Sequence, residues 1–553
     1  MLLEKNVGEI TMEAWDVIVL GDGPAALRAA ATAAEAGAST LMMSADSLGS
    51  GVASATDGLA APIKESTMKS HSDDTIKAGN FLCDQDIVSQ RISQATRQVD
   101  LLERWGVIFR RDADGIPLVR RAAGHTLPRL TTAGDALARE VQQVMEEQCM
   151  KHGVIRRGDQ IPLNLVHTDR EVHGIIALDL STGKLNALQA KSVIIADGGY
   201  EGVWKGTNIG LGIDLAMQTG LAVRNMEFAA WTPLFVSGTN VEIPIGMLAD
   251  GATIHEPNGN PLAIEDFADP CQLAIAVGNN GFVLDARNMG DSNVWWSQTM
   301  EIVSTRLGID MRRQTVPISA QVSTTLGGIV TDEHGRAISG KWSRWFTGLY
   351  AAGSAASSGV HGAGIVAGNQ LLDSMVGGYE AGSHAASHCK KAKFTGKAQL
   401  ETYLGVAEAD LDLEMEGAES GPVQRTGPLF AKLNEIMNTN VGLNRNADNL
   451  ASSLEMLEGL SIDAEKVHLD DKSRLFNTNL LESLRLKAGI RLAIATVQSA
   501  ISREETRGTH QRSDFVESNS ELLHHTLVDK EGNTSSLAIR KGSSGTWILS
   551  PEV

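Results

Sequence analysis

The sequence predicts an α/β fold in which one parallel-sheet domain is assembled from separate stretches of the chain. An inserted α+β capping domain interrupts it, and a helical C-terminal domain follows it. Three observations carry this prediction. Apolar runs end in glycine turns near residues 21, 198 and 353, a pattern typical of buried parallel strands. The stretch 235–335 reads as short strands and loops, and beyond about residue 395 apolar residues recur at helical spacing.

The first strand–turn–helix unit covers residues 16–31. Residues 17–20 are apolar and rich in β-branched side chains, which favours a buried strand, and small residues after it favour a helix. The turn reads G-x-G-x-x-A, where the glycines permit a tight turn and a close approach of a pyrophosphate to the helix N-terminus. A lone match is weak, but a second strand at 40–43 gives it the right context. The predicted dinucleotide-contacting residues are Gly21, Gly23, Pro24 and Ala26.

The rest of the chain follows in order. Residues 65–160 read as mostly helical, and a hairpin pattern beginning at 163–166 leads into a buried strand at 192–195. Helices are predicted around 430–437 and 481–495. The domain boundaries predicted from these signals are 14–234 and 336–395 for the parallel-sheet domain, 235–335 for the capping domain, and 396–553 for the helical domain with a short terminal strand region.

Composition excludes several classes of function. The chain of 553 residues has a net charge of −19, which argues against nucleic-acid binding. Its four cysteines form no C-x-x-C pair, so we predict no disulfide framework, no internal iron–sulfur cluster and no metal site. The acidic N-terminus is unlike a secretory signal, and no apolar run approaches about 18 residues. We expect a cytoplasmic protein that reaches the inner face of a membrane only through partners.

Ordered motifs run through nearly the whole chain. They are AGNFLCDQDIV at 78–88, ADGGY at 196–200, NMEF at 225–228, TTLGGIVTD at 324–332, GLYAAGSAASSGVHGA at 348–363, FNTNLLESLRL at 476–486, SREETRGTHQRSDF at 502–515 and HHTLV at 524–528. Together they resemble the flavoprotein subunit of succinate dehydrogenase and fumarate reductase, the complex II family. The resemblance implies an FAD-type Rossmann domain, a cap that closes over substrate, and an iron–sulfur partner subunit that exchanges electrons with the flavin.

The resemblance also implies flavin contacts in several turns. Beyond the first turn, the implied residues are Ser44, Gly51, Gly58, Gly198, Gly199, Gly353, Ser354, Asn369, Gln370 and Leu371. The family attaches FAD through a His in an S-H-T/S-x-A-x-x-G-G run, and that position holds Val52 here. Valine has no nucleophilic nitrogen, so any FAD is expected to be noncovalent.

Other flavin positions differ as well. The family's A-T-G-G run has Asp197 in place of Thr, and its Gly-Glu pair after the third strand becomes a glycine followed by Ser354. The acid of the family's T-G-D-G run falls near Leu211, and Asp214 is the nearest substitute.

The dicarboxylate-binding residues of the family are replaced throughout. A dianion needs fixed cationic donors. The family's Arg in H-G-A-N-R becomes Ile365, and its two histidines fall on Ser323 and Thr232. Its T-E-G-x-R-G-E run aligns with residues 244–250, and its proton-donating Arg has no counterpart in 269–273, where the alignment is poorest. We therefore expect no ordinary succinate–fumarate chemistry.

Few reactive side chains remain. His361 and Arg287 are the only candidates for a catalytic role, although a histidine that holds its loop by a backbone hydrogen bond and a surface arginine are the favoured interpretations. The tryptophan pair at 295–296 is either a stacking wall or has one ring packed inward. His510 and Arg512 match family positions and are interpreted as structural.

Three functions stay open at this point. The chain is a noncatalytic member of the family that pairs with an iron–sulfur subunit or a second flavoprotein-like subunit. Alternatively, it is an active oxidoreductase with noncovalent FAD and a different, more apolar substrate. The third interpretation is a true complex II flavoprotein subunit with relocated site residues. The state of the flavin and its response to succinate discriminate among them.

Overall fold

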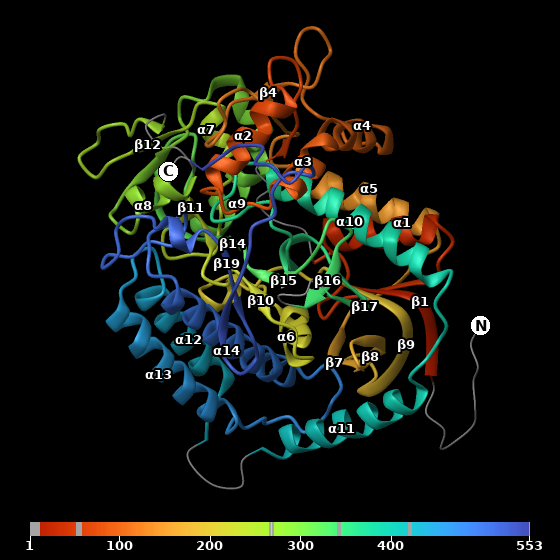
Figure 1. Cartoon of the computed structure of the whole chain (residues 1–553). Helices are drawn as coiled ribbons and strands as arrows, with labels where there is room; N and C mark the ends of the chain where they lie inside the picture. Colours follow the sequence, from red (N-terminus) through yellow and green to blue (C-terminus); the bar gives the residue numbers. More distant parts are fainter. Residues whose placement is uncertain are drawn as a thin grey trace.

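The structure, a computed structural model, contains an eight-stranded, largely parallel sheet, which lies in the right-hand half of Figure 1. The described residues are 12–50, 58–264, 267, 270–339, 344–417 and 423–551. The parallel strands, in spatial order, are β6 (Ile155–Arg157), β2 (Thr40–Met43), β1 (Met12–Leu20), β9 (Lys184–Ile195) and β17 (Arg344–Ala351). The antiparallel strands β7 (Gln160–Thr168) and β8 (Glu171–Asp179) extend it beside β9, and β16 (Arg336–Ser339) pairs with β17. Segments far apart in the chain thus form one sheet, as predicted.

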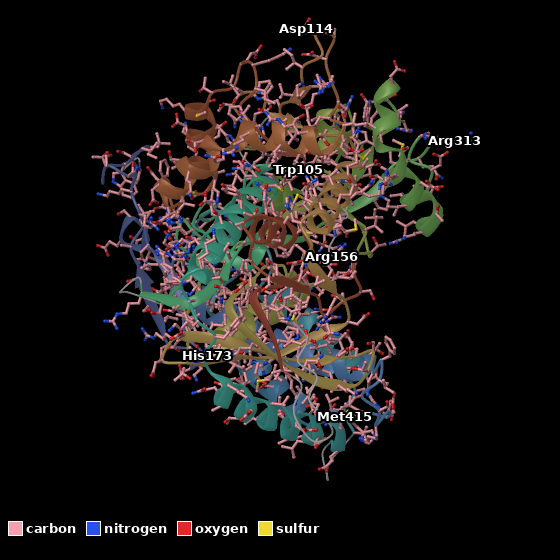
Figure 2. All side chains as sticks on the ribbon, turned by 90° about the vertical axis from the view of Figure 1, so that its right-hand side faces the viewer. Trp105, Asp114, Arg156, His173, Arg313 and Met415 are labelled. Carbon is pink, nitrogen blue, oxygen red and sulfur yellow. The ribbon has the colours of Figure 1, made fainter. Side chains whose placement is uncertain are left out.

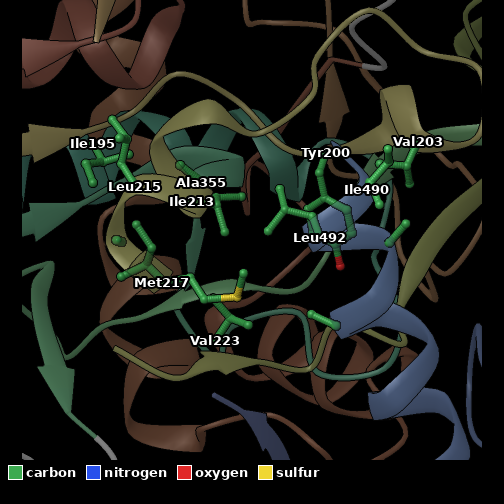
Figure 3. Packing of buried hydrophobic residues seen from close by; sticks show 14 of the residues in the cluster. Ile195, Tyr200, Val203, Ile213, Leu215, Met217, Val223, Ala355, Ile490 and Leu492 are labelled. Atoms are coloured by element: carbon green, nitrogen blue, oxygen red, sulfur yellow. The ribbon is translucent and has the colours of Figure 1, made fainter. Parts of the chain in front are cut away.

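Alternating side chains of the sheet enter two separate cores. Val17 and Val19 of β1 pack with one set of helices, and Ile18 and Leu20 pack with another, because successive side chains of a strand point to opposite faces. The first set is α1 (Pro24–Glu35), α5 (Leu137–Lys151) and α10 (Asn369–Cys389). The second set includes α6 (Leu211–Gln218) and α14 (Thr478–Ser502), whose contacts are drawn in Figure 3. The sheet is therefore covered on both faces.

The stretch 65–160, predicted to be mostly helical, contains four helices, and two short strands within it join a strand at 59–60 in a small sheet. The helices before α5 are α2 (Met68–Ala78), α3 (Gln85–Ser93) and α4 (Ala95–Trp105). The strands β3 (Leu59–Ala60), β5 (Leu130–Thr131) and β4 (Val119–Arg120) pair in that order. These very short strands lack a recognisable alternation, which is why the sequence did not predict them.

The inserted segment has strands, helices and a core of its own, as expected for an α+β cap. Its sheet order is β11 (Ala229–Val236), β14 (Val316–Thr325), β13 (Val283–Asp285) and β12 (Thr253–His255). Its helices are α7 (Gly246–Ala249), α8 (Pro270–Val277) and α9 (Ser297–Leu307). Trp296 is fully buried in this core and Trp295 is half-buried, so one ring of the pair packs inward. The predicted limits at 235 and 335 stay predictions.

A further sheet ties the C-terminus to the middle of the chain. Its strands, in order, are β18 (Ala356–Ser357), β15 (Gly328–Val330), β10 (Val223–Arg224), β19 (His525–Val528) and β20 (Thr534–Leu537). The predicted late strand at 524–528 is β19. Its pairing with β10 places the terminal segment beside the base of the cap (Figure 1).

The C-terminal helices divide into two groups. The helices α12 (Thr426–Asn440), α13 (Ala447–Ala464) and α14 pack on one another, whereas α11 (Lys397–Glu416) lies against β7, β8 and β9. Leu400 and Leu404 of α11 are buried against Val166 and Ile176 of those strands. The first helix after the predicted limit at 396 therefore covers the parallel-sheet domain, and that limit stays a prediction.

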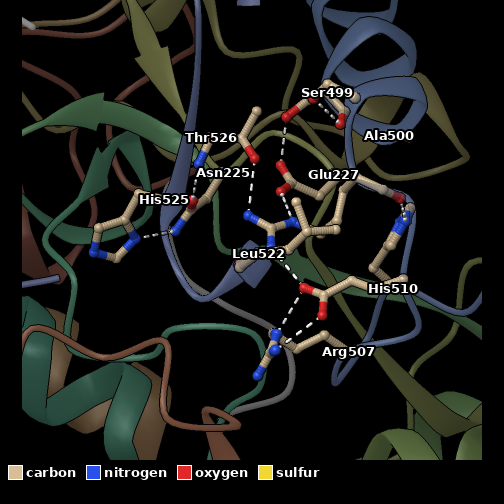
Figure 4. Close-up of polar contacts among 12 residues, drawn as sticks. Asn225, Glu227, Ser499, Ala500, Arg507, His510, Leu522, His525 and Thr526 are labelled. Atoms are coloured by element: carbon tan, nitrogen blue, oxygen red, sulfur yellow. Dashed lines mark hydrogen bonds and ion pairs between the residues drawn. The ribbon is translucent and has the colours of Figure 1, made fainter. Parts of the chain in front are cut away.

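A buried ion network holds the end of α14. Arg503 Nε donates to Glu227 Oε1 at 2.6 Å, and its Nη1 donates to Glu505 Oε1 at 2.8 Å. Arg507 Nε donates to the same Glu505 oxygen at 2.7 Å, and Ser499 donates to Glu227 (Figure 4). Such fully paired charges tolerate burial because each has opposite partners. The network fixes α14 against the loop before β11.

His510 and Arg512 belong to the same structural region. Arg445 Nη1 lies 2.9 Å from His510 Nδ1, and burial lowers the pKa of His510 well below its usual value. Arg512 forms two hydrogen bonds of 2.7 Å with Asp514. Both residues make contacts within the fold, consistent with the structural interpretation.

Figure 2 shows the side chains on the ribbon, with Asp114 and Arg313 toward one end of the molecule and Met415 toward the other. Among the described helices, none combines the length and the apolar character that crossing a membrane requires.

Candidate functional site

The predicted dinucleotide turns meet at one edge of the parallel sheet. Gly21, Gly198 and Gly353 follow the carboxyl ends of β1, β9 and β17, which are neighbours in the sheet. Ser44 follows β2 at the same edge. Helix α1 begins there with no side-chain cap and no acid in its first turn, so its N-terminus is open to an anion.

Position 21 requires glycine for two reasons, its backbone conformation and the lack of space for a side chain. Its φ is +110°, which L side chains rarely adopt, and a Cβ there would lie 2.3 Å from the Ala196 carbonyl oxygen. Gly353 has φ +63°, and its Cβ position lies 2.8 Å from the Ala25 methyl group. The third turn therefore packs directly on the start of α1, and Ser354 follows at this junction.

A second open helix N-terminus faces the same region. Gly368 caps α10 with φ +81°, without a side-chain cap and without an acid in the first turn. The Asn369 side chain points away toward α2, where it contacts His71 Nε2 at 2.8 Å and donates to Thr75 at 2.9 Å. Gln370 and Leu371 are left in the first turn, where their backbone amides suit a carbonyl or anionic acceptor.

A cavity joins the third glycine turn to the start of α10. Its lining includes Gly353, Ser354, His361, Gln370 and Asp373. Gln370 Nε2 donates to Ser354 Oγ at 3.3 Å. This cavity brings together predicted residues that are distant in the sequence.

His361 lies at the edge of this cavity beside a carboxylate. Its Nε2 is 3.6 Å from Asp373 Oδ2, and Asp373 also accepts from Arg91 Nε at 2.8 Å. Burial lowers the pKa of His361, so the ring is neutral at physiological pH. Its Nδ1 has no hydrogen-bond partner among the described residues. The expected ring-to-backbone bond is thus not what orients His361.

The acid at the end of β9 is Asp197, a residue that sequence reasoning noted without assigning it a role. Its Oδ2 accepts from the Gly212 amide at 2.7 Å, and its Oδ1 has no partner among the described residues. Burial raises the pKa of Asp197 to about 6. Asp214, the expected substitute acid, instead forms a bidentate pair with Arg491 of α14. Asp214 lies in the first turn of α6 but is paired with Arg491, whereas Asp197 places a second carboxyl group at the start of that helix.

A second cavity adjoins the first one. Thr232, Ile245, Ser323 and Ile365 all line it, although they lie on four separate segments. These are the positions at which the sequence differs from the complex II pattern. The two cavities share Thr324, Ile365 and Gln370, so this one lies directly beside the start of α10.

Glu242 is the one ionisable side chain among the described residues that line the second cavity. Ser323 Oγ donates to Glu242 Oε1 at 2.8 Å. Sequence reasoning missed Glu242 because no motif contains it; only the pairing of its segment with β11 brings it to the cavity.

The basic side chains near the cap do not face the cavity as free cations: two arginines form ion pairs, and a histidine is neutral. Asp250 pairs with Arg110 and, at 3.3 Å, with Arg120, and it accepts from Trp296 Nε1 at 2.9 Å. His125 Nε2 contacts the Ala367 carbonyl oxygen behind the cavity wall, and burial lowers the pKa of His125 to about 3. None of these side chains supplies a positive charge to the cavity.

The remaining predicted residues lie elsewhere. Arg287 follows β13 and forms two bonds with Asp285, at 2.9 and 2.7 Å, and it lines neither cavity. Gly58 precedes β3 with φ +134°. Gly51 and Val52 lie outside the described residues. No group of metal-binding side chains is found in the described part of the chain.

The arrangement fits a flavin dinucleotide. The open start of α1 suits a pyrophosphate, the Asp197 carboxyl group suits a sugar or ribityl hydroxyl, and the start of α10 suits the polar edge of an isoalloxazine. The second cavity adjoins the start of α10, where the isoalloxazine would lie.

Comparisons with known proteins agree with this geometry. Residues 16–371 match the family model described as FAD binding domain, and residues 430–547 match the model described as fumarate reductase flavoprotein C-term. The Escherichia coli fumarate reductase flavoprotein subunit is 26% identical, with 94% of this chain and 92% of that protein covered. The succinate dehydrogenase flavoprotein subunit of Rickettsia bellii is 28% identical, with 94% of each covered.

Solved structures show the same fold. A structure of E. coli quinol fumarate reductase superposes with a TM-score of 0.88 at 24% identity, with 98% of each chain covered. The sheet, the glycine turns and the family models lead to one conclusion: the chain belongs to the flavoprotein-subunit family of fumarate reductase and succinate dehydrogenase.

Proposed function

We propose that this chain is an FAD-binding, flavoprotein-subunit-like member of a complex II-like assembly that does not act on succinate or fumarate. It is either noncatalytic or of altered specificity. The observation that carries the proposal is the second cavity, in which Thr232, Ile245, Ser323 and Ile365 converge and no lysine, arginine or histidine lines the wall among the described residues.

The electrostatic reason is direct. A four-carbon dicarboxylate carries two negative charges, and each needs a cationic partner once it leaves water. Losing one partner of a desolvated charge costs about 2–5 kcal/mol. The cavity offers hydroxyl groups, apolar side chains and the Glu242 carboxylate, which repels the ligand. No affinity for succinate is left to support turnover.

We infer that the FAD is held noncovalently. The position that carries the attaching histidine in the family is Val52, whose side chain forms no bond to a flavin. The proposed contacts are the backbone of Gly21, Gly23, Ala26 and the first turn of α10, together with Asp197.

The proposed partners are an iron–sulfur subunit or a second flavoprotein-like subunit. The relatives are named flavoprotein subunits, and residues 430–547 of this chain, which include α13 and α14, match the family model of the C-terminal region. Contact with a membrane would come only through such partners. The domain limits at 235, 335 and 396 are part of the same proposal.

An active oxidoreductase with a different substrate is the second candidate. The uncapped start of α10 and the neutral His361 beside Asp373 favour it. The backbone amides at the start of α10 could hold the polar edge of the isoalloxazine, and His361 would lie beside it as a polar group. Retained flavin chemistry with an altered cavity would then give altered specificity rather than inactivity.

The test begins with natively purified protein. Its visible flavin band is recorded, and the protein is then precipitated with acid. We expect the flavin in the supernatant, with no dye-coupled succinate oxidation and no fumarate reduction. Flavin in the pellet would contradict noncovalent binding, and turnover of either acid would contradict the proposed function.

A further inference from the structure

We propose that residues 84–86 form a latch that positions the His361 loop, residues 359–364, by holding the C-terminal segment 538–549 beside it. The inference rests on the proposed function, since it takes the first cavity as the place where the flavin lies. It goes further by naming residues outside the cavity on which cofactor binding depends. These residues belong to the AGNFLCDQDIV motif at 78–88, of which no residue lines either cavity.

The latch binds one position of the segment through three consecutive residues. The Arg540 backbone amide donates to Asp84 Oδ1 at 2.8 Å, and the Gln85 backbone amide donates to the Arg540 carbonyl oxygen at 2.8 Å. The Arg540 guanidinium pairs with Asp86 at 2.5 Å and with Glu333 at 2.8 Å. Position 540 is thus held through its amide, its carbonyl group and its side chain.

The Gln85 side chain holds a second position of the same segment. Its Oε1 accepts from the Ile548 and Leu549 amides at 2.6 and 3.1 Å, and its Nε2 donates to the Leu549 carbonyl oxygen at 2.8 Å. Gln85 is fully buried, and Leu549 packs on an apolar cluster that includes Ile87. The glutamine therefore satisfies backbone groups that would otherwise be buried without partners. The segment is docked at both of its ends.

The latch also binds the His361 loop directly. The Asp84 backbone amide donates to the Gly359 carbonyl oxygen at 2.8 Å. A Cβ at Gly359 would lie 2.3 Å from Asp84 Oδ2, so the carboxylate packs on the backbone of the loop. Gly359, His361 and Gly362 all line the first cavity. One side of the latch therefore binds the segment, and the other side binds a wall of the cavity.

Buried partners fix the Asp84 carboxylate. Arg224 Nη1 donates to its Oδ2 at 2.9 Å, and His525 Nε2 lies 3.1 Å from its Oδ1. Arg224 belongs to β10 and His525 to β19, which pair with each other. Because hydrogen bonds to an ionised group are strong, the latch keeps a fixed position relative to this sheet.

Apolar contacts join the segment to the wall of the first cavity. Ile539 packs on the cluster that contains Leu326 and Ala363. Leu326 lines the first cavity, and Ala363 belongs to the His361 loop. The Ala363 amide donates to the Gly79 carbonyl oxygen at 3.1 Å, which ties the loop to the residues just before the latch. Undocking of the segment would expose this wall and loosen the loop.

Docking of the segment and binding of the cofactor should therefore stabilise each other, because both act on the same loop. Such coupling is reciprocal, since each binding event changes the affinity of the other by the same factor. A contact that served the fold alone would lower stability without this reciprocity. The effect of FAD on docking therefore distinguishes a latch from a purely structural contact.

Trypsin reports docking in the full chain, because Lys541 lies within the segment and is exposed. The rate of cleavage after Lys541 is followed by mass spectrometry with and without FAD, and FAD affinity is measured by fluorescence titration of the apoprotein. We expect FAD to slow this cleavage several-fold. Arg540→Gln removes the ion pairs with Asp86 and Glu333, so it should speed cleavage and weaken FAD binding by about 5–50-fold.

A second variant and a control accompany this test. Gln85→Met removes the three bonds to residues 548–549 and should change both measurements in the same direction. The control is Arg474→Gln, which removes an arginine that also has two acidic partners, Asp412 and Glu408, and lines neither cavity. It should leave the cleavage rate and FAD affinity unchanged.

Cleavage that FAD does not slow, or latch variants with unchanged FAD affinity, would overturn the inference while the proposed function stands. Turnover of succinate, or flavin that cannot be removed from the protein, would instead contradict the proposed function. With flavin that cannot be removed, the latch is judged from the visible circular dichroism of the bound flavin. A spectrum that Arg540→Gln and Gln85→Met leave unaltered would then overturn the inference.

Discussion

Gly21 shows how a single residue constrains the start of the site. Its positive φ excludes a side chain, and so does the space around it, because a methyl carbon added there would lie 2.3 Å from the Ala196 carbonyl oxygen. Gly37, which follows α1, also has a positive φ of +92°, but nothing lies within 4 Å of its Cβ position. A side chain at position 21 would therefore cause both backbone strain and a steric clash, whereas a side chain at position 37 would cause backbone strain alone.

We predict that Gly21→Ala destabilises the protein by several kcal/mol more than Gly37→Ala. The second variant should cost only the left-handed backbone strain, about 1–2 kcal/mol. Chemical denaturation of both variants measures the difference, and FAD content checks the site. Equal losses of unfolding free energy would contradict the packing argument.

Asp197 leads to a prediction about pH. Its carboxyl group has a pKa raised to about 6, so it is ionised at pH 7.5 and protonated well below pH 6. If its free Oδ1 accepts from a hydroxyl of the cofactor, FAD affinity falls as the pH is lowered through about 6. Asp197→Asn should weaken FAD binding by about 10–100-fold at pH 7.5 and remove this pH dependence.

Fluorescence titration of the apoprotein with FAD measures both effects. Asp16→Asn is the matched control, because Asp16 is the middle residue of β1 and pairs with Lys191 of β9 rather than with a residue of the glycine turns. An unchanged FAD affinity in Asp197→Asn would remove this residue from the cofactor site.

At the scale of elements, the buried network of Glu227 joins α14 to the loop before β11. Glu227→Gln keeps the size of the side chain but leaves the Arg503 guanidinium without one of its two anionic partners. We predict a loss of about 3 kcal/mol in the free energy of unfolding. Lys69→Ala, which removes an exposed pair with Asp73, should cost at most about 0.5 kcal/mol. Similar losses in the two variants would contradict a structural role for the network.

The sequence predicted elements best where one local pattern was decisive. The apolar run 40–43 is β2, and the helix of the fingerprint is α1, which begins at Pro24. β1 begins at Met12 rather than at residue 17, because residues 12–15 also pair with residues 187–190 of β9. That pairing is long-range and leaves no local signal.

The sequence also could not predict which elements pack together, because such contacts are long-range and leave no local signal. Helical spacing beyond about residue 395 predicts a helical region, but it does not locate α11, and the contact of α11 with β7–β9 depends on tertiary structure. Glu242 and Asp197 gain their places in the site from strand pairing and from the start of α6. Motifs located the positions that line the second cavity, but only the fold shows that Thr232, Ser323 and Ile365 meet there.

At the scale of the whole molecule, the proposed function depends on the contrast between two neighbouring regions. The edge of the parallel sheet keeps the turns and helix starts that suit FAD, while the adjoining cavity has no cationic wall among the described residues. The chain belongs to a family of flavoprotein subunits, and the lining of this cavity is the observation on which its proposed role rests.

The most direct test follows the flavin of the holoprotein in the absence of oxygen. Dithionite is added to one sample, and succinate to another; fumarate is then added to the dithionite-reduced sample after excess reductant has been removed. We predict that dithionite bleaches the flavin band, that succinate leaves it unchanged, and that fumarate does not restore it. Bleaching by succinate, or reoxidation by fumarate, would contradict the central claim that this cavity does not serve dicarboxylates.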